Sequence, residues 1–232
     1  MAFDQADFAL YTFFRSTSTA RVRTAAKLKN IPVRFHYVNV RKDEQFKEEF
    51  LQLNPNGTVP VLTVTPKDQG AQKVPSFSIK QSVAMLEFFE EAFPDRTPLL
   101  PPVTDVVGRA HVRDLVNLVA GDVQPPTNRR ILLRVKELGG SMEEWALQLM
   151  GNGLKAFEEM AKPLAGKYSY GDTLTLADVV LAPAVENGVR YGVDLNKLPT
   201  VKRIFQHISS LEAFKAADWR HQEDTPKDEL DS

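Results

Sequence analysis

The sequence has no cysteine among its 232 residues and only four histidines. Without cysteine the chain can form no disulfide, no thiolate metal site and no thiol nucleophile of its own, so any sulfur chemistry must use a thiol that a ligand brings. The histidines are scattered, without the close His and Glu spacing of a metal site, so we expect no bound metal. No apolar run approaches the roughly 20 residues that a membrane-spanning helix needs.

An excess of either charge is also missing. Lys and Arg total 29 against 30 Asp and Glu, which gives a formal net charge of -1. No global field therefore draws the chain to nucleic acid or to an anionic membrane, and we expect a small-molecule partner. The N-terminus lacks a basic region followed by an apolar one, so we expect no export signal and a cytoplasmic protein. With 43% hydrophobic residues, the chain can bury the core of one large or two small domains.

The first part of the chain alternates between strand and helix patterns. The apolar periodicities predict a βαβ unit, a further helix and then a ββα unit. Pro60 directly precedes the third strand, where it cannot donate to a ladder and allows a cis bond. Asn30 tolerates the left-handed conformation that ends a helix. The predicted ranges are strand 8–13, a helix ending at Asn30, strand 33–37, helix 46–53, strand 61–64, an extended hairpin loop over 66–75, strand 77–79 and a helix from 81.

The proline-rich stretch 93–103 separates this part from a region without strand patterns. We predict domains at 1–92 and 104–232 with 93–103 as the linker. Ser141 with Glu144, and Thr175 with Asp178, have the spacing of capping boxes that begin helices, and the second helix is apolar enough to be buried nearly all round. One or two helices follow near the C-terminus. The polar tail after Trp219 is expected to be loosely ordered or draped over the surface.

Four hydroxyl residues in succession, 16–19, lie where the first strand runs into a basic helix. A helix N-terminus favours negative charge, so a small anion such as a thiolate could bind there. The alternative is an over-supplied helix cap with a solvated basic face behind it. These residues alone favour the alternative.

Segments along almost the whole chain change that ranking, because they match one known family in order and spacing. Residues 14–23 resemble the Ser-Ser-Cys-Ser-Trp-Arg-Val-Arg signature of the zeta-class glutathione transferases, whose members include maleylacetoacetate isomerase. Ser18 replaces the cysteine of that signature and Ala20 its tryptophan. Further matches lie at Leu53-Asn54-Pro55, Val59-Pro60, Gln81-Ser82, 120–125, Gly171-Asp172 with Ala177-Asp178, 187–195 and 211–214.

The resemblance implies an α/β thioredoxin-like N-terminal domain followed by an all-α C-terminal domain, with glutathione as the cofactor and a homodimer as the assembly. It implies a cis-trans isomerase acting on maleylacetoacetate-like diketo acids in aromatic amino acid degradation. Two alternatives stay open. One is a general transferase that conjugates glutathione to small electrophiles such as halogenated acids, which the loss of the cysteine and tryptophan keeps open. The other is a non-catalytic transferase-like binding module, which usually lacks the activating hydroxyl.

Carried over residue by residue, the resemblance also implies a site. Ser16 would activate the glutathione thiol with Thr17 beside it, leaving Thr19 as a plain helix cap. Arg15 and Arg190 would bind a dicarboxylate substrate, although each could equally form a surface salt bridge. Asp178 is expected to be structural, within its capping box. The residues implied to hold glutathione are Val59 through its backbone, Gln81 and Ser82 at the γ-glutamyl carboxylate, Gln45 at the glycyl end, and Gln124 and Asn128 from the helical region.

Overall fold

The computed structural model describes residues 3–67 and 74–230, which fall into two compact units. The first unit comprises residues 1–98 and 215–232, and the second comprises 99–214. Sequence patterns alone place everything after the linker in the helical region. In the structure the chain instead returns to the first unit at Lys215. The C-terminal segment therefore belongs with the strands.

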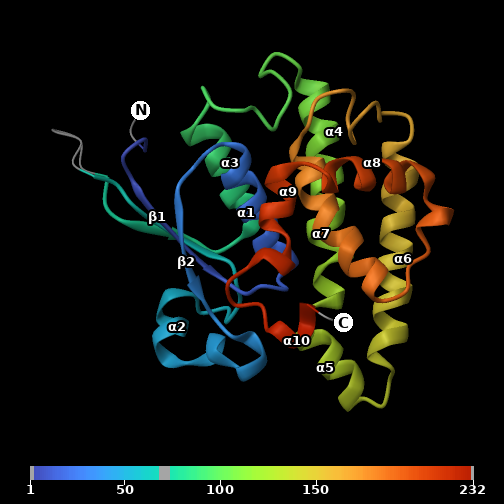
Figure 1. Cartoon of the computed structure of the whole chain (residues 1–232), viewed down its shortest axis with the longest axis horizontal. Helices are drawn as coiled ribbons and strands as arrows, with labels where there is room; N and C mark the ends of the chain where they lie inside the picture. The colour runs from blue at the N-terminus through green and yellow to red at the C-terminus, as the bar shows by residue number, and fades with distance from the viewer. Residues whose placement is uncertain (1–2, 68–73, 231–232) are drawn as a thin grey trace. The chain divides into compact units, whose positions relative to one another are not determined.

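The first unit is built on a four-stranded mixed sheet in the order β2-β1-β3-β4 (Figure 1). β1 pairs in parallel with β2 and antiparallel with β3, which places Leu10 opposite Phe35 on one side and Leu62 on the other. Leu10 and Leu62 are fully buried at the centre, whereas Phe35 on the edge strand is partly exposed. The strands are β1 (Asp7–Thr12), β2 (Val33–Tyr37), β3 (Val61–Thr65) and β4 (Phe77–Ile79), in agreement with the predicted ranges to within one residue.

Helices α1 (Thr17–Leu28) and α3 (Ser82–Ala92) pack side by side in this unit (Figure 1). Asn30 has a φ of 51°, so the left-handed end predicted for the first helix is confirmed. The predicted helix 46–53 is shorter in the structure. The 3-10 turns η1 (Val40–Lys42) and η2 (Glu44–Phe46) precede α2 (Glu48–Leu53), because extended backbone at Lys47 separates η2 from the helix.

The expected cis bond and loop lie between α2 and β4. The Val59-Pro60 peptide bond is cis, as the sequence allows. Of the predicted loop 66–75, residues 68–73 lie outside the described residues. The described residues on either side of them have no regular structure.

The second unit is helical in the part of the chain that the structure describes. Its longest helix, α6, begins where Ser141 accepts the N–H of Glu144 at 3.1 Å. Helix α5 carries four cations and buries only Leu132, so sequence patterns did not predict it. The segments are α4 (Val106–Asn117), the π-helical η3 (Leu118–Val123), η4 (Pro125–Thr127), α5 (Arg129–Glu137), α6 (Met142–Ala161), α7 (Leu176–Arg190), η5 (Leu195–Lys197) and α8 (Pro199–Ser209).

Helix α7 is buried along most of its length, as its composition predicts. Thr175 and Asp178 form the expected capping box at its start. The Asp178 carboxylate accepts the N–H groups of Thr175 and Ser169, both at 2.8 Å. Burial raises the pKa of Asp178 despite these donors. Asp178 therefore connects the loop before α7 to the helix, in the structural role predicted for it.

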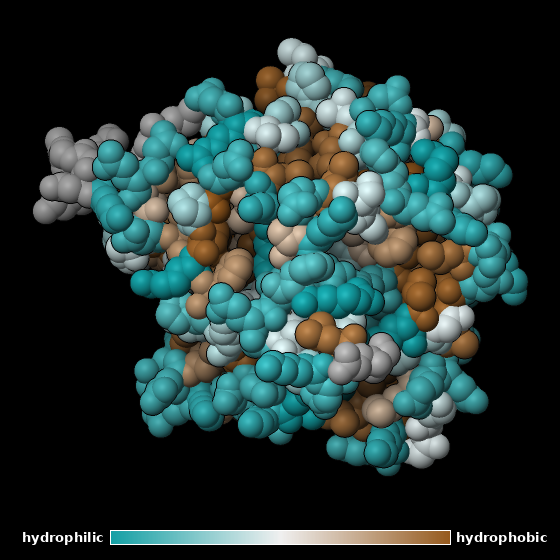
Figure 2. Space-filling model, viewed as in Figure 1, coloured by the Kyte–Doolittle hydropathy of each residue, from teal (hydrophilic) through white to brown (hydrophobic). Residues whose placement is uncertain are grey.

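After α9 (Glu212–Ala217), the chain forms the turn η6 (Trp219–His221) and the short helix α10 (Lys227–Leu230). Polar residues cover most of the molecular face seen in Figure 2, with apolar patches between them. None of the helices that the structure describes is long and apolar enough to cross a membrane.

Candidate active site

The hydroxyl cluster lies at the N-terminal end of α1, directly after β1. Ser16 is the N-cap of the helix, with extended backbone at φ -76° and ψ 112°. Its Oγ accepts the backbone N–H of Thr19 at 3.2 Å and the Thr19 hydroxyl at 2.8 Å. The prediction that Thr19 is the cap is therefore wrong. Thr19 is fully buried and acts as a donor to Ser16, which is the actual cap.

The hydrogen bonds of Ser16 decide which way its proton points. A serine hydroxyl has two acceptor positions and one proton. Thr19 fills both acceptor positions, so Ser16 can act toward any further group only as a donor. Ser18 Oγ lies 3.1 Å from Ser16 Oγ and itself donates to the Val59 carbonyl at 3.2 Å. Because the Ser18 proton is used on Val59, Ser16 is the donor in this contact. An anion beside the helix N-terminus can accept that hydrogen bond in place of Ser18.

Thr17 and Val59 are the other predicted residues near this point. Thr17 is the first residue of α1 and is half-buried beside Ser16. Val59 precedes β3, and the bond from Ser18 places its carbonyl next to the hydroxyl cluster. The structure thus brings Val59 next to Ser16 and Ser18, although Val59 lies 41 positions after Ser18 in the sequence.

The N-terminus of α3 provides a second place for an anion. Its N-cap, Gln81, makes no side-chain capping bond, so this side chain satisfies none of the N–H groups of the first turn. Ser82 is buried there and accepts a hydrogen bond from Arg21 Nη1 at 3.2 Å. Arg21 is itself buried, and Nε and Nη2 have no hydrogen-bond partner among the described residues.

Arg21 was not among the predicted site residues, although it lies within the matched signature. Burial lowers the pKa of Arg21 to about 10, so its guanidinium remains protonated at neutral pH. A positive charge beside the first turn of α3 adds to the positive end of the helix dipole. The combination favours a carboxylate at Gln81 and Ser82.

Gln45 lies in η2 and is buried. Its Oε1 has no hydrogen-bond partner among the residues that the structure describes, and its Nε2 lies 3.5 Å from Asp43 Oδ1. A buried acceptor without a donor is uncommon, because its desolvation costs about 1–3 kcal/mol. The side chain therefore suits a ligand that supplies an N–H group.

Three predicted residues belong to the second unit. Gln124 donates to the Asn128 side chain, so the structure brings these two amides together. Asn128 is the N-cap of α5 but makes no side-chain capping bond. Arg190 ends α7 and is exposed, with Cζ 5.5 Å from the Tyr191 ring centre.

Arg15 has partners that the sequence did not predict. Its Nε donates to Glu229 Oε2 at 2.6 Å, and its Cζ lies 3.7 Å from the centre of the Trp219 ring. Arg41 forms an ion pair with the other oxygen of Glu229. The tail after Trp219 was expected to be loosely ordered or draped over the surface, so the sequence did not indicate Glu229 as a partner of Arg15. The large aromatic Trp219, directly before that tail, was the available signal that this end of the chain packs against other residues.

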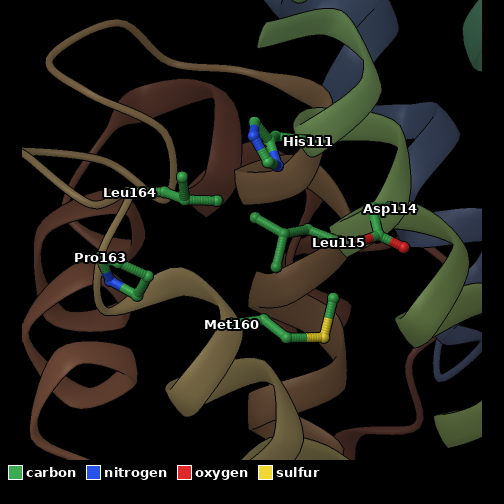
Figure 3. Close-up of a pocket in the computed structure, with 6 residues that line it drawn as sticks. All are labelled: His111, Asp114, Leu115, Met160, Pro163 and Leu164. Atoms are coloured by element: carbon green, nitrogen blue, oxygen red, sulfur yellow. The ribbon is translucent and has the colours of Figure 1, made fainter. Parts of the chain in front are cut away.

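A pocket of about 160 Å³ lies elsewhere, within the second unit (Figure 3). The Leu115, Met160 and Leu164 side chains face its middle, whereas the Asp114 carboxylate points away from it. Its remaining lining residues are His111 and Pro163. This pocket contains none of the predicted site residues and no nucleophile beside a base. The candidate site therefore lies at the N-terminal ends of α1 and α3.

Family models match both parts of the chain. Residues 15–92 match the model described as glutathione S-transferase, N-terminal domain, and residues 137–217 match glutathione S-transferase, C-terminal domain. The first match includes the hydroxyl cluster, Gln45, Val59 and the N-terminus of α3.

Similar proteins cover nearly the full length. Maleylacetoacetate isomerase from Emericella nidulans is 42% identical over 94% of this chain and 94% of its own. The crystal structure of maleylacetoacetate isomerase from Anaeromyxobacter dehalogenans, with bound dicarboxyethyl glutathione and citrate, superposes with a TM-score of 0.85 at 34% identity and covers 99% of both chains. A bacterial maleylpyruvate isomerase, described as a zeta-class glutathione S-transferase, superposes with a TM-score of 0.83 at 36% identity over 94% of this chain and all of its own.

The order of the elements, the hydroxyl cap on α1 and the extent of these matches agree with one another. The chain belongs to the glutathione S-transferase family, among the zeta-class enzymes that include the maleylacetoacetate isomerases.

Proposed function

We propose that this protein is a glutathione-dependent cis-trans isomerase of maleylacetoacetate-like diketo acids, working in the cytoplasm in the degradation of tyrosine and phenylalanine. The observation that carries the proposal is the Ser16 hydroxyl at the N-terminus of α1. Thr19 fills both of its acceptor positions, so its proton, which is directed to Ser18 Oγ at 3.1 Å, is the group that it can offer to an anion. Such a group stabilises a thiolate that a ligand brings, and the chain has no cysteine of its own.

The residues of the first unit fit glutathione at three points. The uncapped first turn of α3, with Ser82 and the buried Arg21, suits the γ-glutamyl carboxylate. The backbone of Val59 suits the cysteinyl peptide group. Gln45 offers a buried acceptor without a partner among the described residues to an N–H group at the glycyl end. Gln124 and Asn128 are proposed as further contacts from the second unit.

The energy needed to activate the thiol is available at Ser16. Lowering a thiol pKa from about 8.5 by about two units takes near 2.7 kcal/mol. The helix N-terminus supplies roughly 0.3–1 kcal/mol and a hydrogen bond to a charged group roughly 1.5–3 kcal/mol. The two together suffice and the dipole alone does not, so Ser16 is assigned as the activating residue, with Thr17 beside it.

When bound, glutathione supplies a thiolate that adds to the cis double bond, permits rotation about the resulting single bond and leaves again with the trans isomer formed. Arg15 is proposed to hold a substrate carboxylate and to stabilise the negative charge that develops on the carbonyl oxygen. Arg190 is proposed to hold a carboxylate from the second unit. Ser16 donates its hydrogen bond to the sulfur whenever that sulfur is negative.

An assay of maleylacetone isomerisation with and without glutathione tests the proposal. We expect cis-to-trans turnover that requires glutathione and leaves its concentration unchanged. Accumulation of a glutathione conjugate without turnover would instead support the conjugating transferase. That second function stays open because Ser18 and the half-buried Ala20 replace the cysteine and the tryptophan of the zeta-class signature.

We also propose that the chain forms a homodimer through α3 and α4, the two helices that the family resemblance implies. Helix α4 shows exposed apolar residues. Val106 and Val107 at the start of this helix are 71% and 66% exposed, and Val103 just before it is 80% exposed. Three neighbouring exposed valines form an apolar surface of the kind that subunit interfaces cover.

A further inference from the structure

The C-terminal segment, residues 217–230, is hydrogen-bonded to α1 and to the residues just before it. Arg23, buried within α1, donates to the Ala217 carbonyl from Nε at 3.1 Å and from Nη2 at 2.9 Å. Farther along, Asp224 Oδ2 accepts the backbone N–H of Phe14 at 2.9 Å. The segment is therefore held at two points beside residues 13–16. Of the two alternatives expected for the tail, the loosely ordered one is wrong.

Glu229, near the end of this segment, joins two arginines. Its Oε2 lies 2.6 Å from Arg15 Nε, and its Oε1 pairs with Arg41 Nη1. The side chains of Arg15 and Glu229 are only 16% and 17% exposed, so water competes weakly for this contact. Partial burial on its own raises the pKa of Glu229, but the hydrogen bonds from Arg41 and Arg15 outweigh it and hold that pKa below its ordinary value. The carboxylate is ionised at neutral pH.

Trp219 supports Arg15 from the same segment. The Arg15 guanidinium lies over the indole with Cζ 3.7 Å from the ring centre, in the range of a cation-π contact. Stacking fixes the plane of the guanidinium, and a fixed plane is what directional pairing with a carboxylate requires. Trp219 therefore orients Arg15 whether the carboxylate belongs to Glu229 or to a ligand.

We propose that Arg15 and Arg41 form a two-arginine carboxylate site beside the thiol-activating end of α1, and that Glu229 occupies it in place of the carboxylate of an anionic substrate. The identity of that substrate as a dicarboxylate rests on the proposed function. Arg41, on η1, is thereby a specificity-determining residue that the sequence did not single out. Arg15 Nε and Arg41 Nη1 each pair with one oxygen of Glu229. A substrate carboxylate can take these same two donors only when Glu229 leaves them, so Glu229 and the substrate exclude each other.

The exclusion sets the size of the expected effect. A ligand that binds only the vacated site has its apparent affinity reduced by the fraction of molecules in which the site is vacant. If Glu229 occupies the arginines in nine molecules of ten, removing its charge tightens dicarboxylate binding about tenfold. Replacing Arg41 has the opposite effect, because the ligand then loses one of its two partners.

Maleate, titrated into the protein without glutathione, measures binding apart from chemistry. Trp219 fluorescence reports it in a Trp145→Phe background, since Trp145 is the only other tryptophan and belongs to the second unit. We expect Glu229→Gln to lower the Kd for maleate about 3- to 10-fold and Arg41→Met to raise it. Asp228→Asn is the matched control, because it removes the same charge from the neighbouring, exposed residue and should leave the Kd unchanged.

An unchanged or raised Kd in Glu229→Gln overturns the proposal, as does the absence of maleate binding to every variant. A raised Kd would mean that Glu229 positions the arginines for the ligand. The isomerase assay separates this result from the proposed function. If the wild type isomerises the substrate and Glu229→Gln has the same KM, the result counts only against the proposed role of Glu229. If Glu229→Gln binds maleate more tightly but neither protein isomerises the substrate, the result counts only against the proposed function.

Discussion

At the scale of single residues, both acceptor positions of the Ser16 hydroxyl are filled by Thr19. Replacing Ser16 by alanine removes the donor to the thiolate and leaves only the helix N-terminus. The loss of roughly 1.5–3 kcal/mol should raise the pKa of the bound thiol by about 1–2 units. We expect kcat/KM at pH 7 to fall about 10- to 100-fold and the rising limb of the pH profile to move upward accordingly.

The matched variant is Thr17→Val, which removes the neighbouring hydroxyl but keeps Ser16. Its pH profile should stay near that of the wild type, and a larger shift in Thr17→Val than in Ser16→Ala would reassign the activating role. Because Ser16 is also the N-cap of α1, its loss should cost about 1 kcal/mol of stability. The free energy of unfolding of both variants therefore needs to be measured beside the kinetics.

Arg21 offers a second prediction for a single residue, because its charge lies beside the first turn of α3 and reaches Ser82. In Arg21→Met we expect the KM for glutathione to rise about 3- to 10-fold, because the glutathione carboxylate loses the positive charge beside the first turn of α3. The kcat at saturating glutathione should change little. Arg21→Lys keeps the charge and should recover most of the affinity. Equal loss in both variants would show that packing, and not charge, explains the effect.

Local chemistry placed the hydroxyl cluster at the start of α1, but the family resemblance was needed to single out Ser16, and the partner of Arg15 was missed. Ser16, Ser18 and their helix lie within a few positions of one another, where capping rules predict a hydroxyl cap but do not decide which of the four residues it is. Glu229 and Arg15 are 214 positions apart. No local rule joins them, since the contact depends on the path that the chain takes after α9.

At the scale of elements, the capping box of α7 carries the clearest prediction. Asp178 is fully buried and accepts the N–H groups of Thr175 and Ser169. Alanine would leave both donors buried without a partner, at about 1–3 kcal/mol each, so we expect Asp178→Ala to lose about 3–5 kcal/mol in urea unfolding. Ser141→Ala, at the exposed cap of α6, should lose only about 1 kcal/mol. Similar losses in the two variants would mean that burial does not matter here.

Elements with strong apolar periodicity were predicted, and those without it were missed. Strands β1 and β3 and helix α7 bury most of their residues, and β2 has alternating apolar residues in its sequence although none of them is fully buried. Helix α5 instead carries Arg129, Arg130, Arg134 and Lys136, and it buries a single leucine. Such a helix gives a weak periodic signal because most of its surface faces water.

At the scale of the whole molecule, sequence patterns identified the strand-containing and helical parts but not the return of the chain to the first unit. The proline-rich stretch is a composition signal that any reading of the sequence can use. The attachment of residues 217–230 depends on Arg23, Asp224 and Glu229 meeting partners near the opposite end of the chain. Composition marks that segment only as polar.

The proposed homodimer is tested at the same scale. Light scattering after size-exclusion chromatography should give a mass twice the 26.0 kDa of the single chain. Charged residues in the middle of an apolar interface must lose their hydration, so the double variant Val106→Glu with Val107→Glu should elute as a monomer. Val189→Glu changes a valine on α7 that is also exposed and should remain dimeric. A wild-type mass of 26.0 kDa would contradict the dimer, and a dimeric double variant would place the interface away from the start of α4.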